Sequence, residues 1–162
     1  MAKSAATILL VEDDTHDVEL MKLAFDHAKS PFSFVSVSDG GEAVKYLTGE
    51  GKYADRALFP EPWLVLLDLS MPVMDGFEVL RWMSQQTPSQ WPPVIVLSYS
   101  RLENDVKLAV QLGAKLYVQK PIDLDAAVAF VKGLGDFHVE TTTPSPTVQA
   151  QNLPDSGPRS QL

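Results

Sequence analysis

Trp63-Leu-Val-Leu-Leu67, followed directly by Asp68, is the stretch that most strongly determines the expected fold. Five consecutive apolar residues without polar alternation are typical of a strand that is covered on both faces. Similar short runs predict strands over residues Thr7–Val11, Phe32–Val37, Val94–Leu97 and Lys115–Gln119. The run Phe32–Val37 alternates more between apolar and polar residues, which predicts a position near an edge of the sheet.

Segments with helical periodicity separate these runs. Apolar residues recur at spacings of three and four, as Val18, Met21 and Phe25 do after the first run. Helix N-caps are predicted at Asp14 or Thr15, Asp39, Asp75, Ser100 and Asp123, and helix ends near Gly49, Gly113 and Gly135. This alternation predicts an α/β fold: a flavodoxin-like (βα)5 doubly wound sandwich with a parallel five-stranded sheet in the order 2-1-3-4-5.

The composition excludes several classes of protein. The 162 residues carry a formal net charge of -8, which disfavours binding to nucleic acid or to anionic membranes. Cysteine is absent, so disulfides, Cys-ligated zinc and thiol chemistry are excluded. No apolar run reaches the length of a signal-peptide core or a membrane span, and a cytoplasmic protein is therefore expected.

The chain divides into two parts by composition. Residues 1–139 are expected to form one compact domain, whereas residues 140–162 are rich in Pro, Thr and Ser and contain no aromatic residue. Such a composition predicts a tail that buries no core and supplies no output domain. The connection from Glu50 to Pro62 is long for a link between a helix and a strand, which indicates a surface contact element.

Polar residues follow four of the predicted strands. Glu12, Asp13 and Asp14 come after the first, Asp68 after the third, Ser98 after the fourth, and Lys120 closes the fifth. Because the carboxyl ends of parallel strands share one edge of the sheet, these side chains are expected to meet in one crevice.

The charges in this crevice indicate a metal. Glu12, Asp13 and Asp68 would face the single ammonium of Lys120, which leaves uncompensated negative charge. A few carboxylates together with a ligand phosphate form the usual environment of Mg²⁺. Lys120 and the Ser98 hydroxyl would complete a site for phosphoryl transfer, with a carboxylate as the nucleophile.

Four segments resemble the signature segments of response-regulator receiver domains of two-component signalling. They are Ile8-Leu-Leu-Val-Glu-Asp-Asp14, Leu66-Leu-Asp-Leu-Ser-Met-Pro-Val-Met-Asp-Gly76, Val94-Ile-Val-Leu-Ser98 and Gly113-Ala-Lys-Leu-Tyr-Val-Gln-Lys-Pro121. The resemblance extends over about residues 7 to 137. All four segments in this order form a highly specific pattern, although each alone is weak.

The resemblance assigns roles by position. It implies that Asp68 is the phosphoacceptor and that Glu12, Asp13, Asp68 and the backbone carbonyl of Ser70 hold Mg²⁺. Lys120 matches the phosphate-binding lysine, and the peptide bond to Pro121 is expected to be cis. Ser98 and Tyr117 match the switch hydroxyl and the switch aromatic residue.

The family pattern also implies partners. A sensor histidine kinase would phosphorylate Asp68, and the face built from the fourth helix, the fifth strand and the fifth helix would change for partner binding or homodimerisation. The segment Glu12-Asp-Asp-Thr-His-Asp-Val-Glu-Leu20 and the long Gly49–Pro62 loop resemble the short regulators that partner phytochrome-type kinases. The resemblance implies a signalling protein rather than an enzyme, with at most self-phosphorylation from small donors and autodephosphorylation.

Two residues depart from the common family pattern. Ser70 stands where Asn or Met is more frequent, and Tyr99 stands where a small residue is usual. A bulky ring beside Ser98 would narrow access to Asp68, so Tyr99 puts the rates of phosphorylation and hydrolysis in doubt.

Other functions remain open at this stage. A flavin-binding electron carrier on this fold would need a Ser/Thr/Gly-rich phosphate loop after the first strand, where three acids stand instead. An aspartate phosphatase would usually carry a second Asp at position 70, which is Ser. A phosphorylation-independent interaction module is disfavoured by the complete set of polar residues, although Tyr99 keeps it open. Each polar residue alone also has a structural explanation, such as helix capping by Asp14 or a solvent-exposed lysine at position 120.

Overall fold

The computed structural model describes residues 5–86 and 91–135. Within these ranges, strands alternate with helices, and the strands form one parallel sheet in the order β2-β1-β3-β4-β5. The elements are β1 Thr7–Val11, α1 Thr15–His27, β2 Ser33–Val37, α2 Gly40–Thr48, the 3-10 turn η1 Gly51–Ala54, β3 Pro62–Leu67, α3 Gly76–Ser84, β4 Val94–Ser98, α4 Glu103–Gln111, β5 Leu116–Gln119 and α5 Leu124–Leu134. The predicted fold class and strand order are confirmed.

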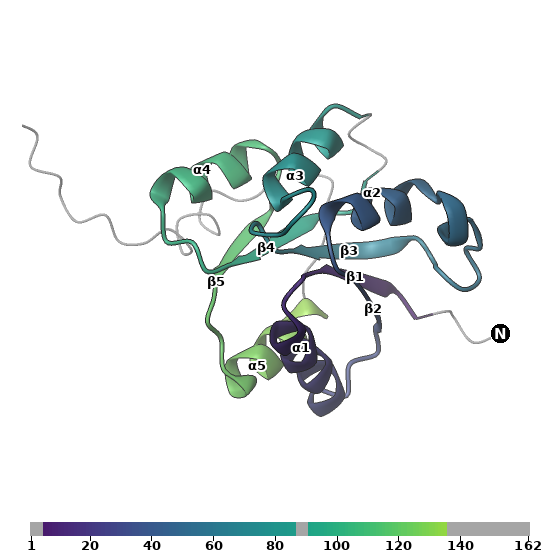
Figure 1. Ribbon diagram of the computed structural model, residues 1–162. Coiled ribbons are helices and arrows are strands. Elements are labelled where there is room, and N and C mark those ends of the chain that lie inside the picture. The colour runs from purple at the N-terminus through teal and green to yellow at the C-terminus, as the bar shows by residue number, and fades with distance from the viewer. Residues whose placement is uncertain (1–4, 87–90, 136–162) are drawn as a thin grey trace, which may run out of the picture.

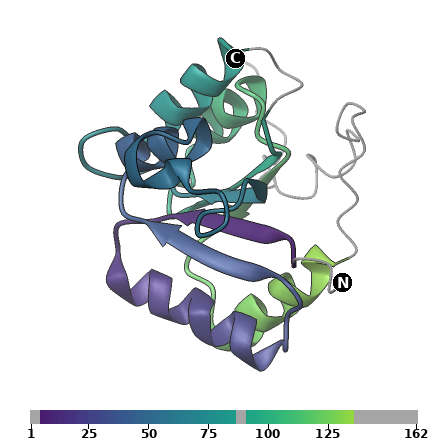
Figure 2. The ribbon, with the colours of Figure 1, turned by 90° about the vertical axis from the view of Figure 1, so that its right-hand side faces the viewer.

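Helices cover both faces of the sheet. In Figure 1, α1 and α5 lie together on one side, and α2, α3 and α4 lie on the other. Figure 2 shows the same layers along the other direction, with the purple α1 below the sheet. Strands β1, β3 and β4 therefore lie between two helical layers, which explains their continuous apolar character.

Alternate residues of each central strand point into opposite cores. In β1, Ile8 and Leu10 join the core under α1 and α5, whereas Leu9 and Val11 join the core under α2, α3 and α4. Both sets are fully buried. Strand β2 is an edge strand with partly exposed residues, as its sequence alternation predicts.

Most of the predicted helix caps are present. Asp14, Asp39, Asp75 and Asp123 each accept hydrogen bonds from backbone N–H groups in the first turn of their helix. Gly49 ends α2 with a left-handed backbone (φ 72°), which glycine adopts without strain. The prediction of Ser100 as the cap of α4 was wrong. Leu102 precedes that helix, and the Ser100 hydroxyl bonds to the Asp105 side chain instead.

The long connection after α2 packs tightly against that helix. The Arg56 guanidinium donates hydrogen bonds to the carbonyl oxygens of Tyr46 (2.8 Å), Leu47 (3.1 Å) and Phe59 (3.2 Å). Tyr46 donates its own hydroxyl proton to the carbonyl of Pro60, at 2.9 Å. The connection is thus fixed by hydrogen bonds along its length, and a role as a contact element stays a prediction.

The predicted domain end near Val139 and the tail of residues 140–162 lie outside the described residues, so this division stays a prediction. Among the residues that are described, no helix is both long enough and apolar enough to cross a bilayer.

Candidate functional site

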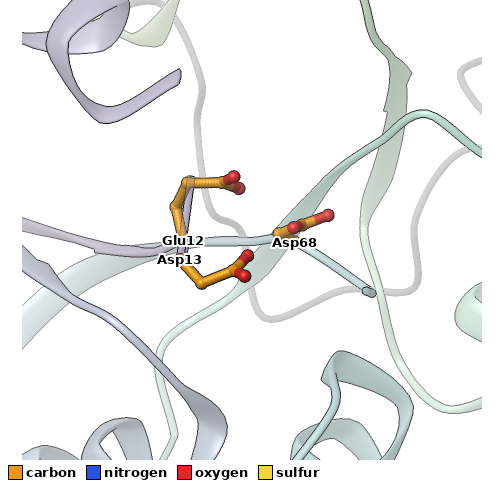
Figure 3. A group of neighbouring side chains, drawn as sticks. All are labelled: Glu12, Asp13 and Asp68. Atoms are coloured by element: carbon orange, nitrogen blue, oxygen red, sulfur yellow. The ribbon is translucent and has the colours of Figure 1, made fainter. Parts of the chain in front are cut away.

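The carboxyl ends of the strands bring the predicted site residues to one edge of the sheet. Glu12 and Asp13 directly follow β1, and Asp68 directly follows β3. Figure 3 shows the carboxylates of Glu12 and Asp13 pointing toward Asp68. One carboxylate oxygen from each residue lies within 4.8 Å of the others, which is close enough for all three to bind one cation.

Backbone hydrogen bonds fix Glu12 and Asp68 to the end of the sheet. The N–H of Glu12 donates to the carbonyl of Val37 in β2, and the N–H of Asp68 donates to the carbonyl of Val11 in β1, both at 3.0 Å. The sheet ladder therefore continues one residue past each strand. As a result, Glu12 and Asp68 start from positions that the sheet itself determines.

The turn after β3 is held by close packing of glycine. Gly76, the first residue of α3, donates its N–H to the carbonyl of Leu69 at 3.0 Å. A Cβ atom at Gly76 would lie 2.3 Å from the carbonyl oxygen of Asp68 and 2.7 Å from the Cα of Leu69. Such distances are far inside van der Waals contact, so only glycine permits this approach of α3 to the Asp68 backbone.

Lys120 lies at the centre of the acidic residues. Its Nζ atom is 3.0 Å from Glu12 Oε2, 2.9 Å from Asp17 Oδ2 and 3.9 Å from Asp68 Oδ1. Its backbone N–H donates to the carbonyl of Ser98 at 2.7 Å, which holds the end of β5 against the end of β4. The Lys120–Pro121 peptide bond is cis, as expected.

These groups are buried although they are polar. The exposed fractions are 4% for Glu12, 5% for Asp68, 5% for Lys120 and 2% for Ser98. Burial of unpaired charge is costly, and polar groups are kept inside a fold where they are paired or functional. Asp13, by contrast, is exposed at the surface of the cleft.

Burial and mutual repulsion change the protonation of the carboxylates. Burial raises the pKa of Glu12 to about 8, because desolvation and the charge of Asp68 outweigh the attraction of Lys120. Burial likewise raises the pKa of Asp68, against the opposing charge of Lys120. Burial lowers the pKa of Lys120, but the hydrogen bond that Lys120 donates to Asp17 and the charges of Asp68 and Glu12 reverse this effect, so the net shift of its pKa is upward.

The turn after β4 is held by side chains. The N–H of Ser100 donates to the Ser98 hydroxyl at 3.1 Å, and the buried Tyr117 donates its hydroxyl proton to the carbonyl of Ser100 at 2.9 Å. Tyr99 between them is 54% exposed. Its hydroxyl donates to Asp17 Oδ1 at 3.2 Å, and its ring centroid lies 4.7 Å from Lys120 Nζ.

The site opens into a cleft of about 1100 Å³. Its lining includes Asp68, Ser98 and Tyr99 together with the acidic residues after β1. Lys120 is not among the described residues that line this cleft, because it lies beneath Glu12, Asp17 and the Tyr99 ring. The ammonium is therefore adjacent to Asp68 but covered from the solvent side.

Sequence reasoning missed one member of the cluster. Asp17 was not singled out, yet it forms the shortest ion pair of Lys120. The available signal was its spacing. Asp17 is four residues after Asp13 and five after Glu12, which places it in the first turn of α1, close to the end of β1. Ser70 lines the cleft and donates its N–H to Asp68 Oδ1 at 3.4 Å. The role of its carbonyl in metal binding stays a prediction.

Comparison with known proteins identifies the family. The model of the response regulator receiver domain matches residues 8–132, which is most of the chain. This chain belongs to the response regulator receiver domain family. The receiver domain fold accounts for the strand order, and the family resemblance inferred from the four sequence segments is confirmed.

Several relatives are similar over nearly their full length. The response regulator Rcp1 of Synechocystis sp. is 34% identical over 136 residues, which cover 84% of this receiver domain chain and 90% of Rcp1. The phosphorylated cyanobacterial phytochrome response regulator RcpA matches with a TM-score of 0.73 and 36% identity, over 88% of this chain and 99% of RcpA. The Mn²⁺-bound form of Rcp1 matches with a TM-score of 0.70 and 33% identity, over 86% of this chain and 98% of that structure.

Proposed function

We propose that this receiver domain accepts a phosphoryl group from a sensor histidine kinase on Asp68 in a Mg²⁺-dependent reaction. The observation that supports this proposal is the buried Asp68 carboxylate, which shares one edge of the sheet with Glu12, Asp13, Ser98 and Lys120. A buried carboxylate with a raised pKa, beside two further acids and an ammonium in a cleft, is typical of a functional site.

The carboxylates fit a hard divalent cation. Glu12, Asp13 and Asp68 offer oxygen ligands close together, and the Ser70 carbonyl would complete the set on the protein side. Oxygen ligands from a few carboxylates, with positions left for water and phosphate, are the arrangement that Mg²⁺ prefers. When bound, Mg²⁺ supplies positive charge that offsets the crowded carboxylates and the incoming phosphoryl oxygens.

The chain's own residues would perform the transfer. An oxygen of the Asp68 carboxylate attacks the phosphorus of the kinase phosphohistidine, so that a P–O bond forms while the P–N bond breaks and the imidazole leaves. The Lys120 ammonium binds one phosphoryl oxygen, and the Ser98 hydroxyl donates to another. Both groups act by positioning and by charge, and neither reacts covalently.

The phosphoryl group would then change one face of the domain. Ser98 is hydrogen-bonded to the turn after β4, and Tyr117 is hydrogen-bonded to the same turn. A shift of Ser98 toward the phosphoryl group would therefore move the turn and the start of α4. We propose that the α4-β5-α5 face is thereby switched for partner binding or homodimerisation.

The similarity to Rcp1 and RcpA supports a particular class of kinase. RcpA is described as a cyanobacterial phytochrome response regulator, and it matches this chain over nearly its full length. We propose a phytochrome-type histidine kinase as the partner, and a signalling role in which any self-phosphorylation from small donors is secondary.

Intact-mass measurement after incubation with Mg²⁺ and phosphoramidate tests the phosphoacceptor. We expect the mass of one phosphoryl group to be gained by the native chain and by Asp26→Asn, a variant in the exposed part of α1. Asp68→Asn should gain none, and neither should the native chain in EDTA. A gain that survives in Asp68→Asn would refute the assignment of the acceptor.

If the native chain gains no mass and does not bind beryllofluoride, the alternative of a phosphorylation-independent interaction module would be favoured. The Tyr99 ring over Lys120 is the observation that keeps this alternative under test. Light scattering with and without beryllofluoride tests the dimer proposal, which predicts a larger mass in the presence of the phosphoryl analogue.

A further inference from the structure

Asp17 and Tyr99 meet across the mouth of the cleft, directly over Lys120. Asp17 lies in the first turn of α1, and Tyr99 lies in the turn between β4 and α4. One Asp17 oxygen accepts the Tyr99 hydroxyl proton at 3.2 Å, and the other accepts from Lys120 Nζ at 2.9 Å. The Tyr99 ring covers the same ammonium at 4.7 Å, within the range of a cation–π contact.

This arrangement occupies most of the hydrogen-bond donors of the Lys120 ammonium. An ammonium has three N–H groups, and charge-assisted bonds to Glu12 and Asp17 occupy two of them. Asp68 Oδ1, at 3.9 Å, lies beyond hydrogen-bond distance. Lys120 is therefore held toward α1 rather than toward the residue that would carry the phosphoryl group.

The apolar surroundings of Lys120 do not fix the position of its ammonium, so its polar partners Glu12 and Asp17 do. Lys120 lines a small cavity whose other walls are mostly apolar, formed by Leu10, Leu20, Met21, Leu97 and Ile122. Apolar walls guide a flexible stem without fixing the direction of its charged head. Asp17 and Glu12 consequently determine where the ammonium lies.

We propose that Asp17 and Tyr99 form a latch, which holds Lys120 away from Asp68 and competes with a phosphoryl group for that ammonium. Asp17 is a positioning residue in this proposal, because it acts on the phosphoryl group through Lys120. The inference rests on the proposed phosphorylation of Asp68. It adds a residue to the site and assigns a function to the departure from the family pattern at Tyr99.

The latch links the chemistry to the turn after β4. A phosphoryl group on Asp68 draws Lys120 from Asp17, since the phosphoryl oxygens offer stronger charge at a shorter distance. The ammonium then no longer lies beneath the Tyr99 ring, so the turn loses its contact with Lys120 and keeps only the Tyr99 hydroxyl bond to Asp17 in α1. Opening of the latch therefore weakens the hold on Tyr99 at the same step that engages Ser98.

Lysine labelling in EDTA tests the resting arrangement without phosphorylation. An amine-reactive ester at limiting concentration should modify Lys120 slowly in the native chain, as measured by peptide mass. We expect about a fivefold faster modification in Asp17→Asn, because the amine loses a charged hydrogen-bond partner. Tyr99→Phe keeps the ring and the carboxylate and should show a smaller increase. Glu19→Gln, also on α1 but paired with Lys22, should match the native rate.

Phosphorylation by phosphoramidate with saturating Mg²⁺ tests the competition. Asp17→Asn should react roughly three- to tenfold faster than the native chain and bind beryllofluoride more tightly by a similar factor. Tyr99→Phe should change both quantities in the same direction by a smaller factor, and Glu19→Gln should change neither.

The outcomes separate the latch from the proposed function. If Asp17→Asn reacts faster while Lys120 labelling and the Tyr99→Phe rate stay at native values, Asp17 acts only as a local charge and the latch is refuted. Equal labelling of Lys120 in all variants also refutes it. If the native chain neither reacts nor binds beryllofluoride while labelling rises as expected, the resting contact is real and the phosphoacceptor proposal has failed.

Discussion

The turn after β3 and the turn after β4 occupy equivalent places in the sheet but are held in different ways. Both follow buried central strands and both line the cleft. The β3 turn is fixed by backbone bonds, from Gly76 to Leu69 and from Gly40 to Met74, and by glycines that leave no space for a Cβ atom. The β4 turn is held by side-chain bonds of Tyr99, Ser100 and Tyr117.

This difference matches the two tasks that the site would perform. A phosphoacceptor needs a fixed position, because transfer depends on alignment of the reacting atoms. A switch needs contacts that can be exchanged for others of similar strength, and hydroxyl bonds at the edge of a cleft meet that need. Substitutions in the two turns test whether the β3 turn is rigid and whether the contacts of the β4 turn can be exchanged.

Gly76→Ala should have the largest effect. The added Cβ would lie 2.3 Å from the Asp68 carbonyl oxygen, so α3 or the turn must move. We expect a loss of about 3 kcal/mol in the free energy of unfolding, measured by urea denaturation. Phosphorylation of Asp68 should also slow, because its backbone is displaced.

Gly133→Ala is the matched control for this prediction. Gly133 lies in α5, and a Cβ atom there would contact nothing within 4 Å. Alanine should raise stability by roughly 0.5 to 1 kcal/mol, since it restricts the unfolded chain and favours the helix. Equal destabilisation by the two substitutions would show that the β3 turn has no special rigidity.

The buried carboxylates of the cleft should make the free energy of unfolding depend on pH when metal is removed. The pKa of Glu12 is raised from 4.5 to about 8, so the folded state binds more protons than the unfolded state between these values. The free energy of unfolding should therefore fall as pH rises through this window, by on the order of 2 kcal/mol in EDTA. Urea denaturation at several pH values measures the slope.

Glu12→Gln should make this slope shallower, because the titrating group is absent. Saturating Mg²⁺ should flatten it in the native chain, since a cation favours the ionised carboxylates. Asp68, whose pKa is also raised, accounts for the part of the slope that remains in the variant. A stability that increases from pH 5 to pH 8 in EDTA would contradict the burial effect.

Tyr117→Phe should have a moderate effect confined to the β4 turn. The variant loses the hydrogen bond to the Ser100 carbonyl, at a cost of about 1 kcal/mol. Amide hydrogen exchange should become faster in the turn after β4. Tyr46→Phe removes a bond of equal length to the Pro60 carbonyl and should cost a similar amount without changing exchange in that turn. Identical exchange patterns in both variants would mean that Tyr117 does not hold the turn.

Val73→Gly should have the smallest effect and tests the one strained residue described in the β3 turn. Val73 has a φ of 68° and is 88% exposed, so a β-branched residue adopts a left-handed conformation with little burial in return. Relief of this strain, partly offset by the greater freedom of glycine when unfolded, should stabilise the domain by about 0.5 kcal/mol. A lower melting temperature of the variant would indicate that the exposed Val73 side chain makes a stabilising contact.

The sequence predicted the fold well because its signals were local and repeated. Runs such as Trp63–Leu67 indicated buried strands, and Asp39, Asp75 and Asp123 indicated helix starts by capping chemistry that acts within three residues. The convergence of Glu12, Asp13 and Asp68 followed from the shared edge of a parallel sheet. These inferences needed only the spacing along the chain and the general rules of α/β folds.

Interactions between distant segments could not be predicted in this way. The bond between Asp17 and Tyr99 joins residues 82 positions apart and depends on the direction of two side chains. The Ser100 cap was wrong because α4 begins at Glu103, which leaves Ser100 two residues before the cap position, and only the turn geometry decides where the helix starts. The departure at Tyr99 was noted from the sequence, but its position over Lys120 was not.

The pairing of Lys120 with Glu12 has a consequence for the newly made chain. Their hydrogen bond spans 108 positions of sequence, from the first strand to the end of the last. Loops of that length close late, because long-range contacts form only after much of the chain is ordered. A growing or half-folded chain therefore lacks the ammonium beside Asp68, and under the proposed function it would become able to accept a phosphoryl group only once folding is complete.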